Sequence, residues 1–150
     1  MLRAIELSRQ GMNENAGGPF GAVIVREGKI IGEGWNMVTS KNDPTAHAEV
    51  SAIRKACKKI KNFDLSGCEI YTSCEPCPMC LAAIYWSRID KVYYANSKRD
   101  AAKIDFDDAF FYKELKRPKN KRHVPIKQLM RKDALVVFEE WKEKEDRVEY

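Results

Sequence analysis

The chain has 150 residues and a formal net charge of +5, and 44% of its residues are hydrophobic and 33% charged. This composition is that of an ordinary globular protein, and the length suits one domain with a single sizeable core. It argues against a membrane-spanning protein, since no apolar run is long enough to cross a bilayer. The mild positive charge permits nucleic-acid binding but does not require it.

The cysteines and the first residues of the chain indicate a compartment. Three of the five cysteines form one cluster, which suits a reducing cytosol. Cys57 and Cys68 have no motif around them and are expected to be small buried apolar residues. Residues 1–6 interrupt their apolar pattern with charges, so no signal peptide is expected. We therefore expect a cytoplasmic protein without membrane association.

Apolar spacing and turn residues predict the secondary structure in chain order. The predicted elements are a helix over residues 2–13, a strand over 20–25, a strand beginning at Ile30, a helix over 46–61, a strand over 68–73, a helix over 79–87, a strand over 91–95, a helix over 106–115, a strand over 124–129 and a last helix capped by Asp133. Glu27 and Gly28 turn the first two strands into a hairpin. Residues 37–45 are a polar loop, and the mostly apolar helix over 79–87 is expected to be buried.

The order of these elements indicates the fold class. A hairpin followed by alternating helices and strands predicts an α/β fold with a mixed sheet and helices on both faces. No internal repeat or low-complexity segment interrupts residues 1–150. Ligands of open α/β sheets bind where strands give way to helices, and the motifs below fall at such crossings.

Two short motifs carry the chemistry. His47 is followed two residues later by Glu49, and Cys77 and Cys80 stand three residues apart in Pro-Cys-Pro-Met-Cys. This is the His-x-Glu and Pro-Cys-x-x-Cys pattern of zinc nucleobase deaminases. Zinc takes imidazole and thiolate ligands, and a catalytic site keeps three protein ligands and one open position. The motifs predict a zinc site at His47, Cys77 and Cys80, with Glu49 left free to move protons.

The spacing of these residues restricts where they lie. Cys77 and Cys80 share one helix face, and Pro78 suits the first helical position. Both sulfurs would then lie at a helix N-terminus, which favours thiolate. Residues two apart on a regular helix point to nearly opposite sides, so His47 and Glu49 can serve one metal only at a helix end. The Asp43-Pro44-Thr45 run just before them supports such an end.

Other interpretations of the motifs and of a basic stretch remain open at this point. Cys74 could be the fourth ligand of a structural zinc site, which would leave no open position. An iron–sulfur site is disfavoured, because no fourth cysteine follows Cys80 closely. Residues 113–123 are rich in Lys and Arg and could contact nucleic acid, but no aromatic interleaves the basic residues from 116 to 122.

Five stretches of the sequence resemble a known family. Residues 17–25 (GGPFGAVIV), 43–49 (DPTAHAE) and 72–80 (TSCEPCPMC) resemble the cytidine-deaminase-like superfamily, which includes tRNA adenosine deaminases. Residues 106–114 (FDDAFFYKE) and the final Glu149-Tyr150 resemble the bacterial guanine deaminases of that superfamily. The resemblance covers nearly the whole chain and is weakest from residue 116 to 132. It implies a three-layer fold with a mixed five-stranded sheet and helices on both faces.

The resemblance also implies roles for single residues. One zinc ion per subunit would make hydroxide available near neutral pH, and Glu49 would take the proton of the water and pass protons to a ring nitrogen and to the departing amine. Asn36 matches the amide that binds the base. Phe20 and Trp86 match the apolar walls around the purine. Ala48 flanks a metal ligand and is expected near the substrate.

An acidic pair is expected to select guanine. Guanine presents a ring N–H beside its exocyclic amine, and a carboxylate accepts two such donors well. Adenine has an acceptor at the matching place, which a carboxylate would repel. Either Asp107 or Asp108 could do this, and the resemblance favours Asp108.

The end of the sequence has an unusual pattern. Residues 142–147 (KEKEDR) are strongly charged, as in a frayed end, yet the chain then returns to an aromatic at Tyr150. In similar enzymes the C-terminal segment crosses to the other subunit of a dimer, and its last tyrosine closes the neighbouring site. The resemblance therefore implies a domain-swapped homodimer of one zinc-dependent deaminase domain, residues 1–150, with the segment from about 133 to 150 exchanged.

Taken with the resemblance, the sequence predicts zinc-dependent hydrolytic deamination of guanine to xanthine and ammonia. The substrate is a small purine base, and nucleic acid is not expected as a partner. Rival substrates are guanosine, cytosine and adenosine in tRNA. A rival from another class is a non-catalytic, zinc-stabilised binding module, which would use Cys74 as a fourth ligand and would not depend on Glu49.

Overall fold

The computed structural model describes residues 1–150. The chain divides into two compact units, Met1–Asp108 and Ala109–Tyr150, each of which is described by itself. The elements in order are α1 Leu2–Asn13, β1 Gly21–Arg26, β2 Lys29–Trp35, α2 Val38–Lys41, α3 Ala48–Ile60, β3 Cys68–Cys74, α4 Pro78–Trp86, β4 Lys91–Asn96, α5 Lys98–Ala102, α6 Ala109–Lys116, a 3-10 turn Lys119–Lys121 and α7 Arg131–Glu143. None of these helices combines the length and apolar character that a membrane span requires.

The first unit is built on a mixed four-stranded sheet in the order β2-β1-β3-β4. β1 pairs antiparallel with both β2 and β3, whereas β3 and β4 are parallel. The hairpin between β1 and β2 is confirmed: Glu27 and Gly28 both have positive φ, as a two-residue turn of this hand requires. The parallel pair needs a crossover, and α4 provides it.

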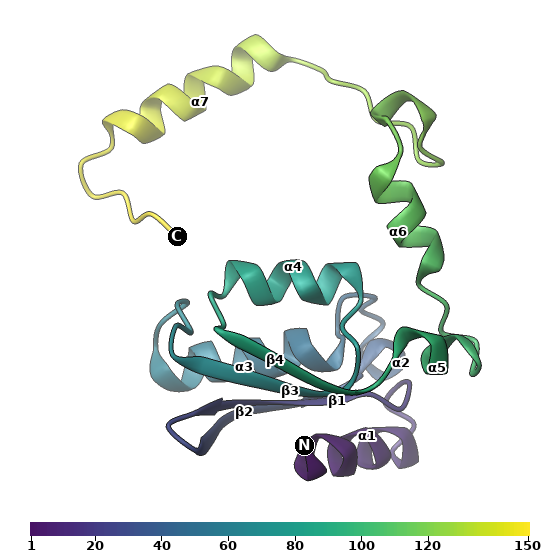
Figure 1. Ribbon diagram of the computed structural model, residues 1–150. Helices are drawn as coiled ribbons and strands as arrows, with labels where there is room; N and C mark the ends of the chain where they lie inside the picture. The colour runs from purple at the N-terminus through teal and green to yellow at the C-terminus, as the bar shows by residue number, and fades with distance from the viewer. The chain divides into compact units, whose positions relative to one another are not determined.

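Helices cover both faces of this sheet, as predicted (Figure 1). α1 packs on one face, where Arg3 forms an ion pair with Glu33 of β2 at 2.7 Å. α3 and α4 lie on the other face and contact each other. The first four residues of β1 are buried, because that strand is covered from both sides.

The main core lies between the sheet and α3 and α4. Ile24 of β1 is paired in register with Ile70 of β3, and both pack in one cluster with Ile84 of α4. Small residues of α3 complete the cluster and let the helix approach the sheet closely: Ala48, Ala52 and Ala56. The N-termini of α3 and α4 are thereby held on the same face of the sheet.

Several predictions about the fold are wrong. The sheet of the first unit has four strands instead of five, because residues 124–129, which belong to the second unit, pair with no strand. Residues 37–45 contain the short helix α2, and α5 was not predicted. α4 is apolar all round but only partly buried: within it only Cys80 and Ile84 are buried, and Tyr85 and Trp86 are 75% and 67% exposed.

The second unit consists of α6, the 3-10 turn and α7. Glu114 of α6 accepts hydrogen bonds from Arg117 Nη1 at 2.6 Å and from the backbone N–H of His123 at 2.7 Å. Arg122 donates to the carbonyls of Leu115 and Arg117 near the end of α6, so the basic stretch folds back on this helix. α6 begins at Ala109 and not at residue 106.

The last helix differs from its prediction in how it begins. α7 begins at Arg131 after Met130, and Asp133 lies in its first turn instead of capping it. No residue of α7 is buried, although Val136, Val137, Phe138 and Trp141 are large and apolar. The apolar side chains of this helix therefore have no covering partner within the second unit.

Candidate active site

His47 lies at the N-cap position of α3, where the backbone is still extended. Glu49 lies in the first turn of the same helix and is buried. The helix end that the two-residue spacing required is thus present. Asp43 Oδ1 accepts hydrogen bonds from both the backbone N–H and the hydroxyl of Thr45, which shapes the turn leading into His47.

The two cysteines lie at the start of α4. Cys77 is the N-cap residue, Pro78 occupies the first helical position, and Cys80 follows in the first turn. Cys77 is half-buried and Cys80 fully buried. The prediction that both sulfurs lie at a helix N-terminus is confirmed, and this position favours the thiolate form.

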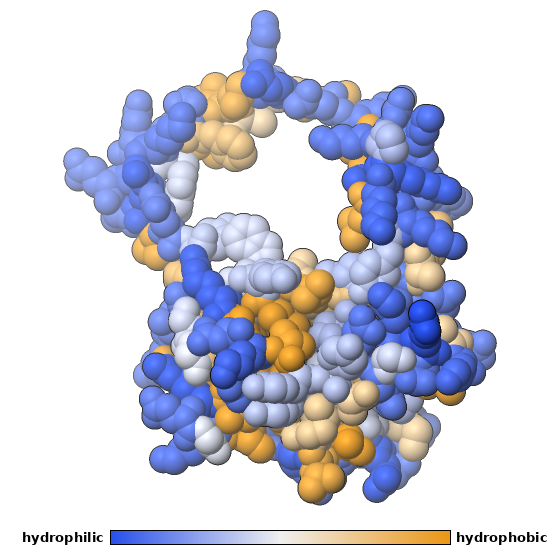
Figure 2. All heavy atoms as spheres, in the orientation of Figure 1, coloured by the Kyte–Doolittle hydropathy of each residue, from blue (hydrophilic) through white to orange (hydrophobic).

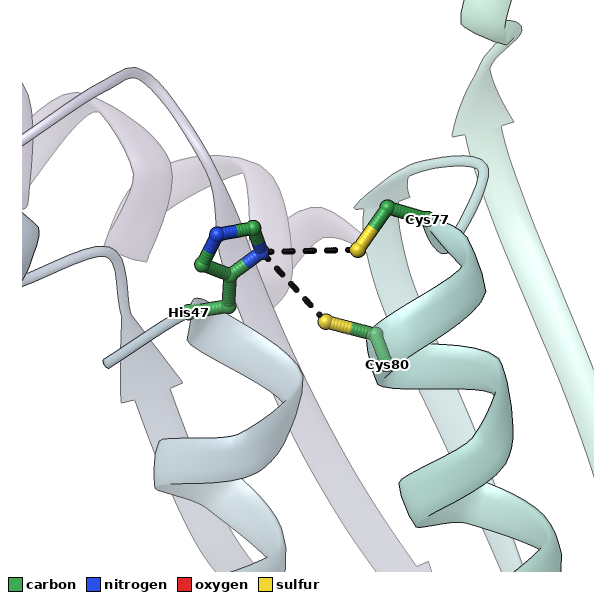
Figure 3. A group of neighbouring side chains, drawn as sticks. All are labelled: His47, Cys77 and Cys80. Atoms are coloured by element: carbon green, nitrogen blue, oxygen red, sulfur yellow. Dashed lines mark hydrogen bonds between the residues drawn. The ribbon is translucent and has the colours of Figure 1, made fainter. Parts of the chain in front are cut away.

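The three predicted ligands meet at one point. His47 Nδ1 faces both sulfurs, at 3.6 Å from Cys77 Sγ and 3.5 Å from Cys80 Sγ (Figure 3). The three ligand atoms all lie within 4.8 Å of one another. A tetrahedral zinc with bonds of about 2.3 Å to sulfur and about 2.0–2.1 Å to nitrogen would hold such atoms about 3.5–3.6 Å apart. The donor set and its spacing therefore fit zinc.

Cys74 does not belong to this group of ligands. It is buried at the end of β3, and its thiol donates to the carbonyl oxygen of Ser97 at 3.7 Å. Burial, with the nearby charge of Glu49, raises the pKa of the Cys74 thiol to about 11. A protonated thiol bonded elsewhere is not a zinc ligand, so the four-ligand structural site has no support in this geometry.

The charges of the site are closely coupled. The adjacent Cys80 thiol, with His47 contributing in the same direction, lowers the pKa of Cys77 to about 4, which favours the thiolate form of Cys77. The adjacent Cys77 and burial raise the pKa of Cys80. Two thiols this close cannot both ionise easily without a cation between them. The arrangement is suited to a divalent metal.

Glu49 lies beside the ligands without being one of them. Its Oε2 is 3.3 Å from Cys80 Sγ, which donates to it. Burial raises the pKa of this carboxyl above its usual range. A carboxyl group whose pKa is shifted toward neutrality can both accept and return a proton.

Asn36 lies directly after β2 and is buried. Its backbone N–H donates to the carbonyl of Phe20 at 3.0 Å. The next residue, Met37, donates to the carbonyl of Ala46 at 2.9 Å, one residue before His47. Asn36 is thus placed between the segment that carries Phe20 and the segment that carries the metal ligand.

Phe20 precedes β1 and is half-buried against the core. Its ring meets the ring of Phe106 edge to face, with centroids 4.9 Å apart. The sequence predicts that Phe106 begins a helix and assigns it no role, although Phe106 opens the 106–114 stretch that resembles guanine deaminases. It lies in the loop after α5, so the aromatic wall has a second member.

The structure separates the two candidate aspartates. Asp108 is half-buried, and burial raises the pKa of its carboxyl, followed by the charge of Cys77. Asp107 is exposed. The carboxyl of Asp108 is therefore electrostatically coupled to Cys77, one of the metal ligands. Lys98 opposes this shift, and its backbone N–H also donates to Glu75 in the cysteine loop at 3.1 Å.

The remaining predicted residues lie in different places. Ala48 is fully buried at the first position of α3, next to His47. Trp86 ends α4, six residues after Cys80, and so is displaced about 9 Å along the helix axis from it. Tyr150 is 72% exposed and belongs to the second unit. Within the first unit, His47, Glu49, Cys77 and Cys80 are brought together, and Trp86 lies at the other end of α4 from the two cysteines.

Comparisons with known proteins agree with this geometry. Residues 1–96 match the cytidine and deoxycytidylate deaminase zinc-binding region. Over 150 residues the chain is 53% identical to the guanine deaminase of Bacillus subtilis, covering 100% of this chain and 96% of that protein. The X-ray structure of the Bacillus subtilis guanine deaminase superposes with a TM-score of 0.96 at 52% identity, covering 99% of this chain and 95% of that one.

More distant relatives include both a tRNA deaminase and a second guanine deaminase. A tRNA-specific adenosine deaminase of Buchnera aphidicola is 43% identical over 112 residues, covering 74% of each chain. A solved guanine deaminase from Nitrosomonas europaea superposes with a TM-score of 0.66 at 31% identity, covering 91% of this chain and 79% of that one. The likeness to guanine deaminases extends over more of the chain than the likeness to the tRNA enzyme.

Proposed function

The chain belongs to the cytidine and deoxycytidylate deaminase family, and we propose that it hydrolyses guanine to xanthine and ammonia. One observation carries the proposal: His47, Cys77 and Cys80 converge on one point beside the buried carboxyl of Glu49. The full-length likeness to the Bacillus subtilis guanine deaminase supports guanine as the substrate. The enzyme is a zinc aminohydrolase that acts on a cyclic amidine.

His47, Cys77 and Cys80 would hold one zinc ion per subunit. Zinc bound there supplies a Lewis acid that makes hydroxide available from water near neutral pH. Glu49 accepts the proton that the water loses, because burial raises the pKa of its carboxyl and so makes the carboxylate a stronger base. Glu49 passes this proton to a ring nitrogen of the base, then takes the second proton of the former water from the hydroxyl added to the ring and passes it to the departing amine. Its burial keeps these protons from exchanging freely with solvent.

Four residues of the first unit would bind the base. Phe20 provides an apolar wall for the ring, and Asn36 provides amide hydrogen bonds. Asp108 accepts from the ring N–H and the exocyclic amine of guanine, which are adjacent donors. Ala48, with no bulky side chain at the start of α3, leaves room beside His47.

Trp86 is proposed to be a second apolar wall for the base, and Tyr150 of a second copy of the chain is proposed to close the site. The exposed apolar face of α4 supports a homodimer: Figure 2 shows apolar side chains gathered on the face of the first unit that carries α4 and β4. Met79, Tyr85 and Trp86 are among the exposed residues of α4. An α-helix that is apolar all round is normally buried, so a second copy is the covering partner that this helix requires.

The C-terminal segment, about residues 133–150, is proposed to be exchanged between the two subunits of this dimer. Each single deaminase domain of residues 1–150 would then be completed by the segment of its neighbour. The uncovered apolar side chains of α7 support such an exchange. A segment that closes over the base would exclude water, which favours a small purine over a polynucleotide. The five free cysteines are consistent with the cytoplasm, where we expect the enzyme to act.

Ammonia release by the zinc-loaded protein tests this function. Guanine, guanosine, adenine, cytosine and an anticodon stem-loop RNA would be supplied in parallel at equal concentration. We expect turnover of guanine and little of the other four. Activity on the RNA alone would overturn the substrate assignment, and activity on guanosine would show that the sugar is accommodated.

A further inference from the structure

The side-chain amide of Asn36 has a defined orientation. Its Oδ1 accepts two backbone hydrogen bonds, from the N–H of Gly18 at 3.3 Å and from the N–H of Val38 at 3.2 Å. Only the oxygen of an amide can accept from an N–H group, so these two donors decide which end of the amide points toward the loop. Both bonds use the oxygen, which leaves the two N–H donors of Nδ2 for other partners.

Gly17 makes this orientation possible because it lies against the amide. A Cβ atom at residue 17 would lie 2.1 Å from Asn36 Oδ1, 2.9 Å from its carbonyl oxygen and 3.0 Å from its Cγ. A real Cβ does not approach other atoms this closely. Any side chain at residue 17 would therefore displace Asn36, which is only 5% exposed and has little space to move.

Gly18 has a second role in the same short segment. A Cβ there would lie 2.8 Å from the Cζ atom of Phe106 and 2.9 Å from the Cε2 atom of Phe20. The glycine pair thus lies between the amide on one side and the two aromatic rings on the other. Residues 17 and 18 shape both the polar and the apolar contact offered to a base.

We propose that Gly17 is a positioning residue for the reaction: it holds the Asn36 amide so that Nδ2 donates hydrogen bonds toward the base. The edge of the base that faces Asn36 must therefore carry an acceptor atom. This rests on the proposed function, because Asn36 is taken to contact the substrate. Guanine offers ring nitrogens and a carbonyl oxygen as acceptors. A base that carries an N–H or an alkyl group at the contacted atom is excluded.

A double-mutant cycle tests the proposal. Gly17→Ala, Asn36→Ala and the double variant would be compared for kcat/KM with guanine, together with zinc content and thermal stability. Gly17→Ala is expected to lower kcat/KM by about tenfold or more, because the donor is displaced. In the Asn36→Ala variant, adding Gly17→Ala is expected to cause no further fall in kcat/KM. Equal losses in both backgrounds, or no loss in the first, would overturn the proposal.

Thr39→Val is the matched control, because it alters the same loop without touching the amide. The Thr39 hydroxyl donates to the carbonyl of Ala16 at 2.8 Å, beside Gly17. Its loss is expected to lower thermal stability while leaving the coupling between residues 17 and 36 intact. A comparable fall in kcat/KM in this control would mean that general loosening of the loop explains the Gly17→Ala result, and the proposal would fail.

Asn36→Asp decides the question if Gly17→Ala does not fold. The carboxylate keeps an oxygen for the N–H groups of Gly18 and Val38 but puts a second acceptor where the donors of Nδ2 were. We expect zinc and fold to be retained and kcat/KM to fall by about a hundredfold; unchanged kinetics would overturn the proposal. If the wild-type protein turns over another base, the same cycle is measured on that base, which separates this inference from the assignment of guanine.

Discussion

The Sγ atom of Cys80 lies 3.3 Å from Oε2 of Glu49, so a metal ligand and a buried carboxyl group from different helices are in direct contact. α3 contributes the carboxyl and α4 the sulfur, and both come from the first turn of their helix. The contact places the proposed proton carrier next to the metal without using it as a ligand. The first predictions follow from this arrangement.

Replacing Glu49 separates catalysis from metal binding. Glu49→Gln keeps the size and the buried position but cannot accept the proton that the water loses. We expect the rate of guanine deamination to fall by about a hundredfold or more, while zinc content and thermal stability stay near wild type. Steady-state kinetics with metal analysis of the same sample checks this. Full activity of the variant would favour a non-catalytic zinc module.

Removing zinc is expected to abolish activity and to lower thermal stability. The ligands come from the starts of α3 and α4, so the metal ties these two helices together. Dialysis against a chelator, followed by zinc addition, should remove and restore both properties. Cys80→Ala should lose zinc, whereas the matched Cys74→Ala should keep it, because Cys74 is not in the ligand group. Loss of zinc in Cys74→Ala would contradict the three-ligand site.

Asp108 is expected to determine the preference for guanine. The Asp108→Asn variant keeps one acceptor oxygen but replaces the other with an NH2 group, which would face one of the two N–H donors of guanine. We therefore expect kcat/KM for guanine to fall by about a hundredfold. Asp107→Asn is the matched control and should change kcat/KM little, since Asp107 is exposed. The reverse result, with Asp107→Asn the damaging change, would exchange the roles of the two residues.

The last residues are expected to close a site of the neighbouring subunit. Deleting residues 148–150 should weaken guanine binding and leave zinc bound. Mixing this truncated variant with Glu49→Gln tests the exchange, because a heterodimer would contain one intact Glu49 facing one intact tail. Recovery of activity on mixing is expected. If mixing the two variants gives no more activity than the variants have separately, each tail serves its own site or none.

The ion pair between Arg3 and Glu33 predicts a pH dependence of stability. Hydrogen bonds from Arg3 lower the pKa of Glu33 below its ordinary value of about 4.3. A lowered folded-state pKa stabilises the protein above the ordinary value and loses that effect as pH falls through the folded value. The difference in unfolding free energy between wild type and Glu33→Gln should therefore shrink in acid. A difference that is constant from pH 7 to pH 3 would contradict this.

Much of the metal site could be predicted because its information is local. Cys77, Pro78 and Cys80 occupy one helical turn, and the His47–Glu49 spacing requires a helix end, so the known deaminase pattern together with short-range geometry was sufficient. The choice between Asp107 and Asp108 needed burial, which depends on residues far along the chain. The orientation of Asn36 depends on Gly18 and on the fold of the loop, and no local pattern reports it.

The wrong predictions also have physical causes. Residues 124–129 have the apolar pattern of a strand, but a strand needs a partner and none is paired with them. α4 is apolar on all sides, which predicted burial, yet Tyr85 and Trp86 are exposed in the single chain. An apolar sequence pattern indicates that a surface will be buried, but it does not say whether the residues that bury it belong to the same chain or to another copy.

The most direct test of the account is the conversion of guanine in water enriched in oxygen-18. The zinc-loaded protein would be incubated with guanine, and the product would be analysed by mass spectrometry together with the ammonia released. We predict xanthine that carries one heavy oxygen, with one ammonia formed for each xanthine. No xanthine from a protein that has its full zinc content would contradict the proposed function.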